Sequence, residues 1–408
     1  MPSSKKEKNL SLLILIFVTF IDFMGIGLVF SIFSKLLFDP SLLFLPLNTT
    51  DATRGIWLGF LFAAMPFIQF FSLPIWGTLS DRKGRKKPLL YSLSFSVLGH
   101  LVSVFGIVFN SITILLISRM VLGIGSGNIS IVQASIADIS KKEQKAKNFG
   151  LYAMAIGAGF TFGPFIGGAL SIYNYTFPFA FSCILTAINL CLAILFYKDT
   201  LHILLAKKFN LSVGLANLKK AFSLKTLRIF FLCYFLISFA WVYFMDFSPV
   251  YLIKRFNFSS AQIGIFYGVL GGFFALSSGL LIRPFLSRFK PETLFFSGSL
   301  LTGLCILSIL FYPSSFWLWI FVIFFSYFAA FINPTITTLV SNNASADMQG
   351  EALGILGSIN TASYTLSALI AGIFVGWHPS LSMYIGGSIT IISSFIVLGT
   401  FRKKLFSK

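Results

Sequence analysis

The hydrophobic positions of this sequence fall into twelve long apolar runs, separated by short polar segments. A membrane-spanning α-helix needs about 20 mostly apolar residues, and each run reaches that length. The predicted fold class is therefore an all-α membrane protein with twelve transmembrane helices. These helices are expected at residues 10–33, 55–76, 88–110, 112–136, 148–170, 176–197, 226–252, 260–283, 292–311, 315–340, 350–375 and 380–401.

The basic residues between the runs predict the orientation of the helices. Lysine and arginine number 26 in alternate segments, four in the opposite loops, and one inside a helix. Cytoplasmic loops carry the excess of positive charge, so both termini are expected in the cytoplasm, at a bacterial inner or plasma membrane. The first run follows three lysines but lacks a small-residue cleavage site, and we expect it to be retained as a helix.

The longest cytoplasmic segment follows the sixth run and predicts the domain organisation. Residues 1–197 would form an N-terminal six-helix bundle, 198–225 a basic cytoplasmic linker, and 226–408 a C-terminal six-helix bundle. Part of the linker is amphipathic and is expected to lie on the inner membrane surface as a tether. Its apolar positions are Leu204, Leu205, Phe209, Leu211, Leu215 and Leu218.

Composition and charge exclude several classes of function. The chain is 56% hydrophobic and only 11% charged, which leaves no room for a large soluble domain. The net charge of +19 sits in short clusters that orient helices and contact anionic lipid, so we do not expect nucleic-acid binding. The four cysteines and three histidines show no metal-ligand or catalytic spacing, so no metal, cofactor or enzyme activity is predicted.

Two charged residues are predicted within the hydrocarbon. Asp22 lies midway through the first run, and Arg119 lies in the fourth. An unpaired ionised acid at this depth costs several kcal/mol, so Asp22 must face an aqueous cavity, find a cation or take up a proton. A purely structural interpretation is that Asp22 and Arg119 form a fixed ion pair. The functional one is a carboxylate that alternates between a proton and Arg119.

A glycine pattern in the fifth run predicts a close helix contact. Gly159, Gly163 and Gly167 recur every four residues on one helix face, which forms a groove for a tightly packed neighbour. Pro164 removes a backbone donor and is expected to bend the helix. With Gly168, these residues form the string Gly-x-x-x-Gly-Pro-x-x-Gly-Gly.

A short, intensely charged segment separates the second and third runs at residues 77–88, and it is expected to be a cytoplasmic loop. Lysines in this segment contribute to the positive charge that orients the helices. An acid adds nothing to that charge, so Asp81 is expected to have a further role.

Several polar or aromatic residues in apolar runs are candidates to line a substrate cavity. Asp246 is either a cavity residue for cationic substrates or an interfacial acid paired with Lys254 or Arg255. For the two asparagines, packing or a helix distortion is the competing explanation. The candidates are Gln69, Trp241, Tyr243, Asp246, Asn333 and Asn360.

Together these motifs resemble the major facilitator superfamily over nearly the whole chain. The 77–88 segment is similar to its signature between helices two and three, and Arg119 with Gly123 to its helix-four motif. The helix-five string resembles the antiporter motif of its twelve-helix drug:proton exporters, which include the tetracycline exporters. The resemblance implies that Asp81, Arg85 and Asp138 form a charge cluster that latches the two halves. It thus gives as candidate conformational-switch residues Gly77, Asp81, Arg82, Gly84, Arg85 and Asp138. It also implies that Asp81 faces the helix-eleven N-terminus near Gly350.

The sequence also departs from that branch. Ser31 and Ser34 stand where its first-helix signature carries prolines, and Gly99-His100 stands where tetracycline exporters carry an acid. Residues 260–283 lack the histidine of those exporters. These differences argue against tetracycline itself as the substrate.

The leading hypothesis is a monomeric proton-coupled antiporter that exports amphipathic or drug-like small molecules, with the proton gradient as its energy source. The alternative is a proton-coupled importer of a nutrient such as an amino acid, nucleoside or siderophore. Its partners would be protons, a small-molecule substrate and the lipid bilayer.

Overall fold

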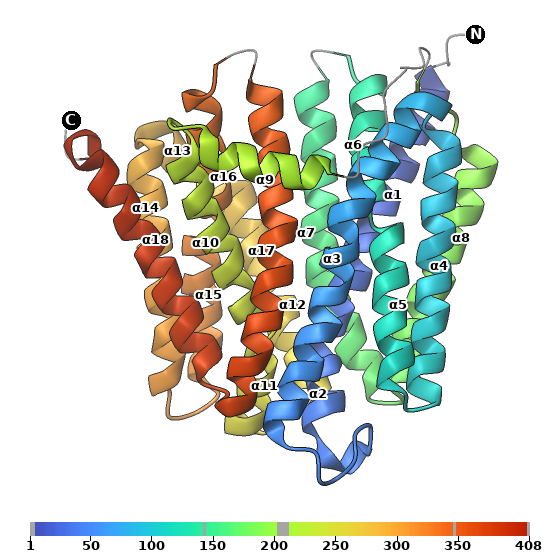
Figure 1. Ribbon diagram of the computed structural model, residues 1–408, viewed down its shortest axis with the longest axis vertical. Helices are drawn as coiled ribbons and strands as arrows, with labels where there is room; N and C mark the ends of the chain where they lie inside the picture. The colour runs from blue at the N-terminus through green and yellow to red at the C-terminus, as the bar shows by residue number, and fades with distance from the viewer. Residues whose placement is uncertain (1–4, 142–143, 202–211, 346–347, 406–408) are drawn as a thin grey trace. The chain divides into compact units, whose positions relative to one another are not determined.

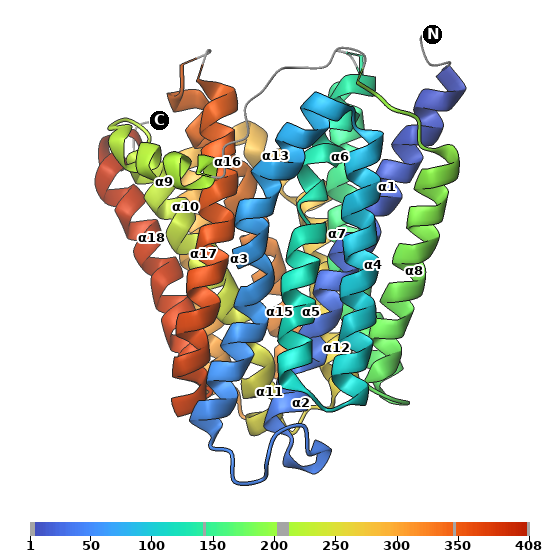
Figure 2. The same cartoon turned by 45° about the vertical axis from the view of Figure 1, so that its right-hand side comes forward.

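The computed structural model describes residues 5–141, 144–201, 212–345 and 348–405, and this part of the chain is helical, with short connecting turns. Figures 1 and 2 show long helices joined by these turns. The α-helices are α1 (Lys5–Leu28), α2 (Phe33–Phe38), α3 (Asp51–Lys83), α4 (Lys86–Val108), α5 (Ile112–Gly125), α6 (Asn128–Ile139), α7 (Lys145–Ser171), α8 (Thr176–Phe196), α9 (Val213–Ser223), α10 (Arg228–Met245), α11 (Ser248–Phe256), α12 (Ser260–Leu276), α13 (Arg283–Arg288), α14 (Pro291–Ser308), α15 (Trp317–Ala329), α16 (Ile332–Asn343), α17 (Gln349–Trp377) and α18 (Leu381–Leu405).

Twelve stretches of the described residues are long and apolar enough to cross a membrane, which confirms the predicted number of spans. Several of these spans are interrupted, at residues 29–32, 126–127, 246–247, 277–282 and 330–331. Pro249 and Pro284 lie in the first turns of α11 and α13. A missing backbone donor costs nothing at the start of a helix, so these prolines favour a new helix just after a break.

The 77–88 segment is not the loop that the sequence predicted. α3 continues through the charged residues to Lys83, α4 begins at Lys86, and only Gly84 and Arg85 lie between them. A helix satisfies its own backbone hydrogen bonds and can carry charged side chains beyond the hydrocarbon. The end of the apolar run therefore marks the membrane boundary and not the end of the helix.

The described chain forms two compact units. The first comprises residues 1–47, 64–213 and 260–268, and the second comprises 48–63, 214–259 and 269–408. The boundaries fall inside α3 and α12, so each of these helices contributes to both units. The organisation into bundles at 1–197 and 226–408 stays a prediction.

Each unit has its own apolar core. In the first unit, Leu15 of α1, Leu89 of α4 and Tyr197 after α8 belong to one buried cluster. In the second, Phe230 of α10 and Ile355 of α17 belong to another. α4 and α8 of the first unit lie side by side in both views (Figures 1 and 2).

Within the described part of the linker, helix α9 contacts α17. Asn217 Nδ2 donates to Ser358 Oγ at 3.0 Å, and Lys220 forms an ion pair with Glu351. In Figure 1, α9 crosses the upper part of α17. Of the apolar positions that predict a surface helix, Leu215 and Leu218 belong to α9. The positions Leu204, Leu205, Phe209 and Leu211 lie outside the described residues.

In the second unit, the first turns of α3 pack closely against α17 through glycines. A Cβ atom on Gly59 would lie 2.8 Å from the carbonyl oxygen of Ala368, and one on Gly376 would lie 2.7 Å from Cα of Ala52. Asp51, at the start of α3, forms an ion pair with Lys254 of α11 at 2.9 Å. Such approaches require glycine, because real Cβ atoms essentially never come within 3.0 Å of another heavy atom.

Candidate functional site

The glycine string of α7 packs against α1 in the first unit. A Cβ atom on Gly159 would lie 2.8 Å from both the Phe20 carbonyl oxygen and the Met24 backbone nitrogen. One on Gly167 would lie 2.8 Å from the Leu28 carbonyl oxygen, and Gly163 is similarly close to Met24. The groove predicted from the spacing of these glycines is confirmed, and the neighbour that fills it is the span carrying Asp22.

Pro164 and Gly168, the remaining residues of the glycine string of α7, make a second close contact. A Cβ atom on Gly168 would lie 2.9 Å from Cα of Gly264 in α12, and the Pro164 carbonyl is also against Gly264. The ring of Pro164 also fits against α1, since a Cβ atom on Gly27 would lie 2.8 Å from its Cδ. α7 therefore contacts α1 and the beginning of α12 through small residues on adjoining faces.

The break between α5 and α6 is stabilised by side chains of α3. Helix ends leave carbonyl groups without intrahelical partners. Ser72 Oγ donates to the Gly123 carbonyl at 2.8 Å, and Trp76 Nε1 donates to that of Ile124 at 2.7 Å. Gln69 Nε2 donates to the Ser126 carbonyl at 3.3 Å. Gln69, a candidate for substrate contact, thus holds the end of α5 in place.

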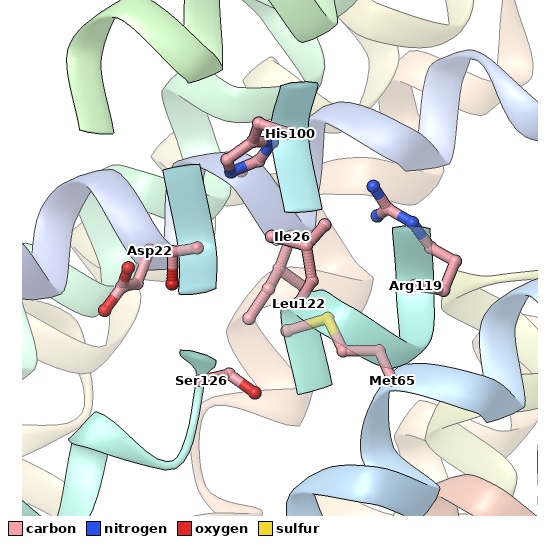
Figure 3. A pocket seen from close by; sticks show the side chains of 9 residues that line it. Asp22, Ile26, Met65, His100, Arg119, Leu122 and Ser126 are labelled. Atoms are coloured by element: carbon pink, nitrogen blue, oxygen red, sulfur yellow. The ribbon is translucent and has the colours of Figure 1, made fainter. Parts of the chain in front are cut away.

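A small cavity lies in the first unit beside this break. It has a volume of about 20 Å³, which is room for one water molecule or slightly more. Figure 3 shows Asp22 and Arg119 at opposite sides of it, with Ile26 and Leu122 between them. Its lining residues are Asp22, Gly25, Ile26, Met65, Ser96, His100, Arg119, Leu122 and Ser126.

Asp22 is held by an asparagine in this structure. Asn128, at the first position of α6, donates from Nδ2 to Asp22 Oδ2 at 2.7 Å. Asn128 is fully buried, and its Oδ1 has no hydrogen-bond partner within the described protein. A neutral amide donor can bind a carboxylic acid or a carboxylate, so this contact accommodates both protonation states of Asp22.

Arg119 is buried away from Asp22. Its side chain is 3% exposed, and Nη2 donates to Ser103 Oγ of α4 at 2.8 Å. The guanidinium carbon lies 5.2 Å from the ring centre of Phe33 and 5.9 Å from that of Phe179. These distances place two aromatic faces within cation–π range. The expected pairing of Asp22 with Arg119 is thus not formed in this conformation, because each residue has another polar partner.

His100 is a cavity residue that the sequence reasoning did not select. It is 7% exposed, and a Cβ atom on Gly25 would lie 3.2 Å from its ring. Its Nδ1 has no partner within the described protein. The available signal was a histidine inside an otherwise apolar run, which sequence analysis noted only as a departure from an exporter pattern.

At the ends of α3 and α6, charged residues form a compact cluster. Arg85 Nη1 contacts Asp81 Oδ1 at 2.6 Å, and Arg85 Nε contacts Asp138 Oδ2 at 2.9 Å. Burial works against the charged form of Arg85, but the hydrogen bonds to Asp138 and Asp81 outweigh it and raise its pKa above the usual value. The structure therefore brings Asp81, Arg85 and Asp138 together, as the resemblance implied, while Arg82 is exposed.

Asp199 organises the turn between α3 and α4, and the sequence analysis missed it. Its carboxylate accepts hydrogen bonds from the backbone nitrogens of Arg85 at 2.9 Å and Lys86 at 3.1 Å. An anion at a helix N-terminus satisfies free donors and is favoured by the helix dipole. Gly84 has φ = 86°, and a Cβ atom there would overlap this carboxylate. Nearby, burial raises the pKa of Tyr197 to about 12, and its hydroxyl donates to Ser135 Oγ at 2.8 Å.

The other cavity candidates lie in the second unit. Trp241 packs against Phe274 and Phe325 with ring centres 6.1 and 6.0 Å apart, and Asn360 Nδ2 donates to Ser238 Oγ at 3.4 Å. The Asn360 contact fits the packing explanation that the sequence analysis kept open for the asparagines.

The remaining three candidates differ in exposure. Tyr243 is 1% exposed, Asn333 in the first turn of α16 is exposed, and Asp246 lies at the break between α10 and α11. Lys254, one of the two cations considered as a partner of Asp246, forms an ion pair with Asp51 at 2.9 Å.

A twelve-span helical protein with an acid and a cation buried inside one unit has the architecture of a membrane transporter. The chain belongs to the Major Facilitator Superfamily, whose family model matches residues 12–368 and 278–405. It is a multi-pass integral membrane protein, a transporter of small molecules and not an enzyme, as the sequence predicted.

Similar proteins are known among resistance proteins and solved transporters. The chain is 29% identical to the quinolone resistance protein NorA of Staphylococcus aureus over 397 residues, covering 96% of each chain. It is 29% identical to the class H tetracycline resistance protein of Pasteurella multocida over 272 residues, covering 64% of each.

Two solved structures share the fold. The human organic anion transporter MFSD10 has a TM-score of 0.71 at 22% identity, covering 96% of this chain and 99% of that one. A POT family transporter has a TM-score of 0.74 at 15% identity, covering 97% and 96%.

Proposed function

We propose that this protein is a proton-driven antiporter that exports amphipathic or drug-like small molecules across a bacterial inner or plasma membrane. The observation that carries the proposal is the placement of Asp22. It is an acid inside a membrane span, beside a small cavity, and its partner is a neutral amide. A carboxyl group in such surroundings is able to gain and lose a proton without breaking a fixed ion pair.

The proposed cycle uses the competition between Asn128 and Arg119 for Asp22. With a proton taken up from outside, Asp22 is neutral and stays on Asn128. Loss of the proton toward the cytoplasm creates a carboxylate, which is attracted to the guanidinium of Arg119. The resulting movement of α1 is passed to α7 through the Gly159–Gly167 seam, where close contact leaves little room for independent motion. The two halves of the transporter then rock about a central substrate site.

Two further observations support export. The α7 string has the form that the antiporter motif of drug exporters takes, and here it packs on the span that carries the titrating acid. Full-length similarity to a protein named for quinolone resistance agrees with efflux of drug-like compounds. The Asp81–Arg85–Asp138 cluster is proposed to act as the conformational switch, while Gly77 faces Ser130 of α6.

Proton release in inverted vesicles tests the proposal. Addition of a substrate from a panel of cationic dyes and quinolones should release protons from energised vesicles containing the wild-type protein. Asp22→Asn should abolish this response. Asp39→Asn should retain it, because Asp39 lies just beyond the first span, where it pairs with Lys35.

Two results would overturn the proposal. One is transport that persists after collapse of the proton gradient. The other is uptake of a labelled amino acid, nucleoside or siderophore by whole cells, which would identify a nutrient importer.

A further inference from the structure

Arg119 is a buried cation for which the described residues show no negatively charged partner. Within the described protein its hydrogen bond is to Ser103, a neutral hydroxyl, and its Nε has no partner. Ser103 is fully buried and also donates to the Gly99 carbonyl at 2.9 Å, which fixes the acceptor in place. Arginine stays charged in proteins, and an unpaired charge in a membrane interior is costly. A bound anion would therefore stabilise the buried guanidinium.

Among the residues lining the cavity, all of them described, no acid supplies that anion in this conformation. Asp22 is the acid among the cavity-lining residues, and its carboxylate accepts from Asn128. Figure 3 shows the apolar side chains of Ile26 and Leu122 between Asp22 and Arg119. Asp22 and Arg119 are therefore separated within one cavity, and the guanidinium end is available to another ligand.

The surroundings of Arg119 fit a small anionic group. His100 lines the same cavity as Arg119. Its Nδ1, which has no partner within the described protein, adds a second polar group to that cavity. Phe33 and Phe179 cover the guanidinium with aromatic rings and exclude bulk water from it. A cavity of about 20 Å³ admits a monatomic ion or the end of a carboxylate, but not a whole drug-like molecule.

We propose that Arg119, positioned by Ser103 and flanked by His100, forms a binding site for one monovalent anionic group, either chloride or a carboxylate on the transported molecule. The guanidinium fork matches a carboxylate geometrically and attracts chloride as a charge. The link from this site to transport rests on the proposed function. The bound anion and the ionised Asp22 would compete for the same cation, so the anion would leave when the proton is lost to the cytoplasm. Chloride released in this way fits the proposed antiporter, whereas a carboxylate substrate released in this way would be imported and fits the nutrient-importer alternative.

Ligand-induced stabilisation of the purified full-length protein in nanodiscs tests the site without any gradient. Chloride would be titrated against methanesulfonate at constant ionic strength, and benzoate would be compared with the neutral benzamide. We expect a saturable rise in apparent Tm of about 1–5 °C for an anion that binds. Benzamide should give no such rise.

Four variants define the site. Arg119→Gln should weaken anion binding at least about tenfold, because a charge-assisted contact is lost. Arg255→Gln removes an exposed cation outside the cavity and should bind as wild type does. Asp22→Asn removes the competitor and should bind at least as tightly as wild type. Should Arg119→Gln fail to fold, Ser103→Ala, which releases the guanidinium from its acceptor, should still weaken binding.

Each result decides the proposal. Stabilisation by benzoate alone supports a substrate carboxylate as the anion, stabilisation by chloride alone supports an ion from solution, and stabilisation by both supports a site open to either. No stabilisation by either anion overturns the site, as does an unchanged response in both Arg119→Gln and Ser103→Ala. Transport that persists after collapse of the proton gradient would refute the antiporter. It would leave the measured anion binding at Arg119 unaffected.

Discussion

Replacement of Gly159 by alanine would test whether the α1–α7 seam positions Asp22, the proposed proton carrier. The new Cβ atom would lie 2.8 Å from the Phe20 carbonyl oxygen, the Met24 nitrogen and the Phe23 Cβ. Two of these three atoms are backbone, so the helices must separate instead of a side chain turning away. Overpacking of this kind costs about 1–3 kcal/mol. The affected turn of α1 contains Asp22, so transport should fall as well.

Gly157→Ala is the matched control on the same helix, because a Cβ atom there would meet nothing within 4 Å. Both variants gain the same helix propensity, about 1 kcal/mol, so their difference isolates the packing cost. In detergent, Gly159→Ala should unfold about 1–5 °C below Gly157→Ala. Its substrate-induced proton release should fall at least about tenfold, since small misplacements of a reacting group are expensive. Equal Tm and equal transport in the two variants would refute a tight seam.

Three further changes follow from the same contacts. Asn189 of α8 is fully buried with neither side-chain atom partnered within the described protein, so Asn189→Leu should stabilise the protein by about 1–3 kcal/mol in thermal unfolding. Asn217→Leu, which loses a bond to Ser358, should not stabilise it. Asp81→Asn should abolish transport at unchanged membrane expression, with Lys83→Gln as a neutral control. Normal transport by Asp81→Asn would show that the Asp81–Arg85–Asp138 cluster has no role in transport and that its charges only orient the helices. Gly84→Ala should lower the apparent Tm, because an alanine at φ = 86° is strained and its Cβ overlaps Asp199. If Asp199→Asn lowers the Tm as well, the carboxylate itself stabilises the turn.

The features predicted from the sequence depend on local periodicity. Runs of apolar residues determine the spans, and the four-residue spacing of Gly159, Gly163 and Gly167 determines that they share a face. The partner of Asp22 did not follow from such patterns, because it depends on how α1 and α6 are rotated about their axes. Asn128 looks in the sequence like an ordinary polar residue near a glycine break. Asp199 was hidden for a related reason: its role arises from contact with a helix N-terminus 113 positions away in the chain.

The interrupted fourth span explains how Asp22 could have two competing partners. Arg119 lies on α5 and Asn128 on α6, nine positions apart in the sequence, which is on the order of 14 Å along a helix axis. An aspartate side chain is too short to cover that distance, so the exchange requires either a shift of α1 or a swing of the long arginine side chain. The hydrogen bond of Arg119 to Ser103 holds it away from Asp22, so the arginine must leave Ser103 before the attraction to the carboxylate can shift α1. Ile26 and Leu122 then act as the barrier that the guanidinium must pass, and an anion at Arg119 would stabilise the separated state.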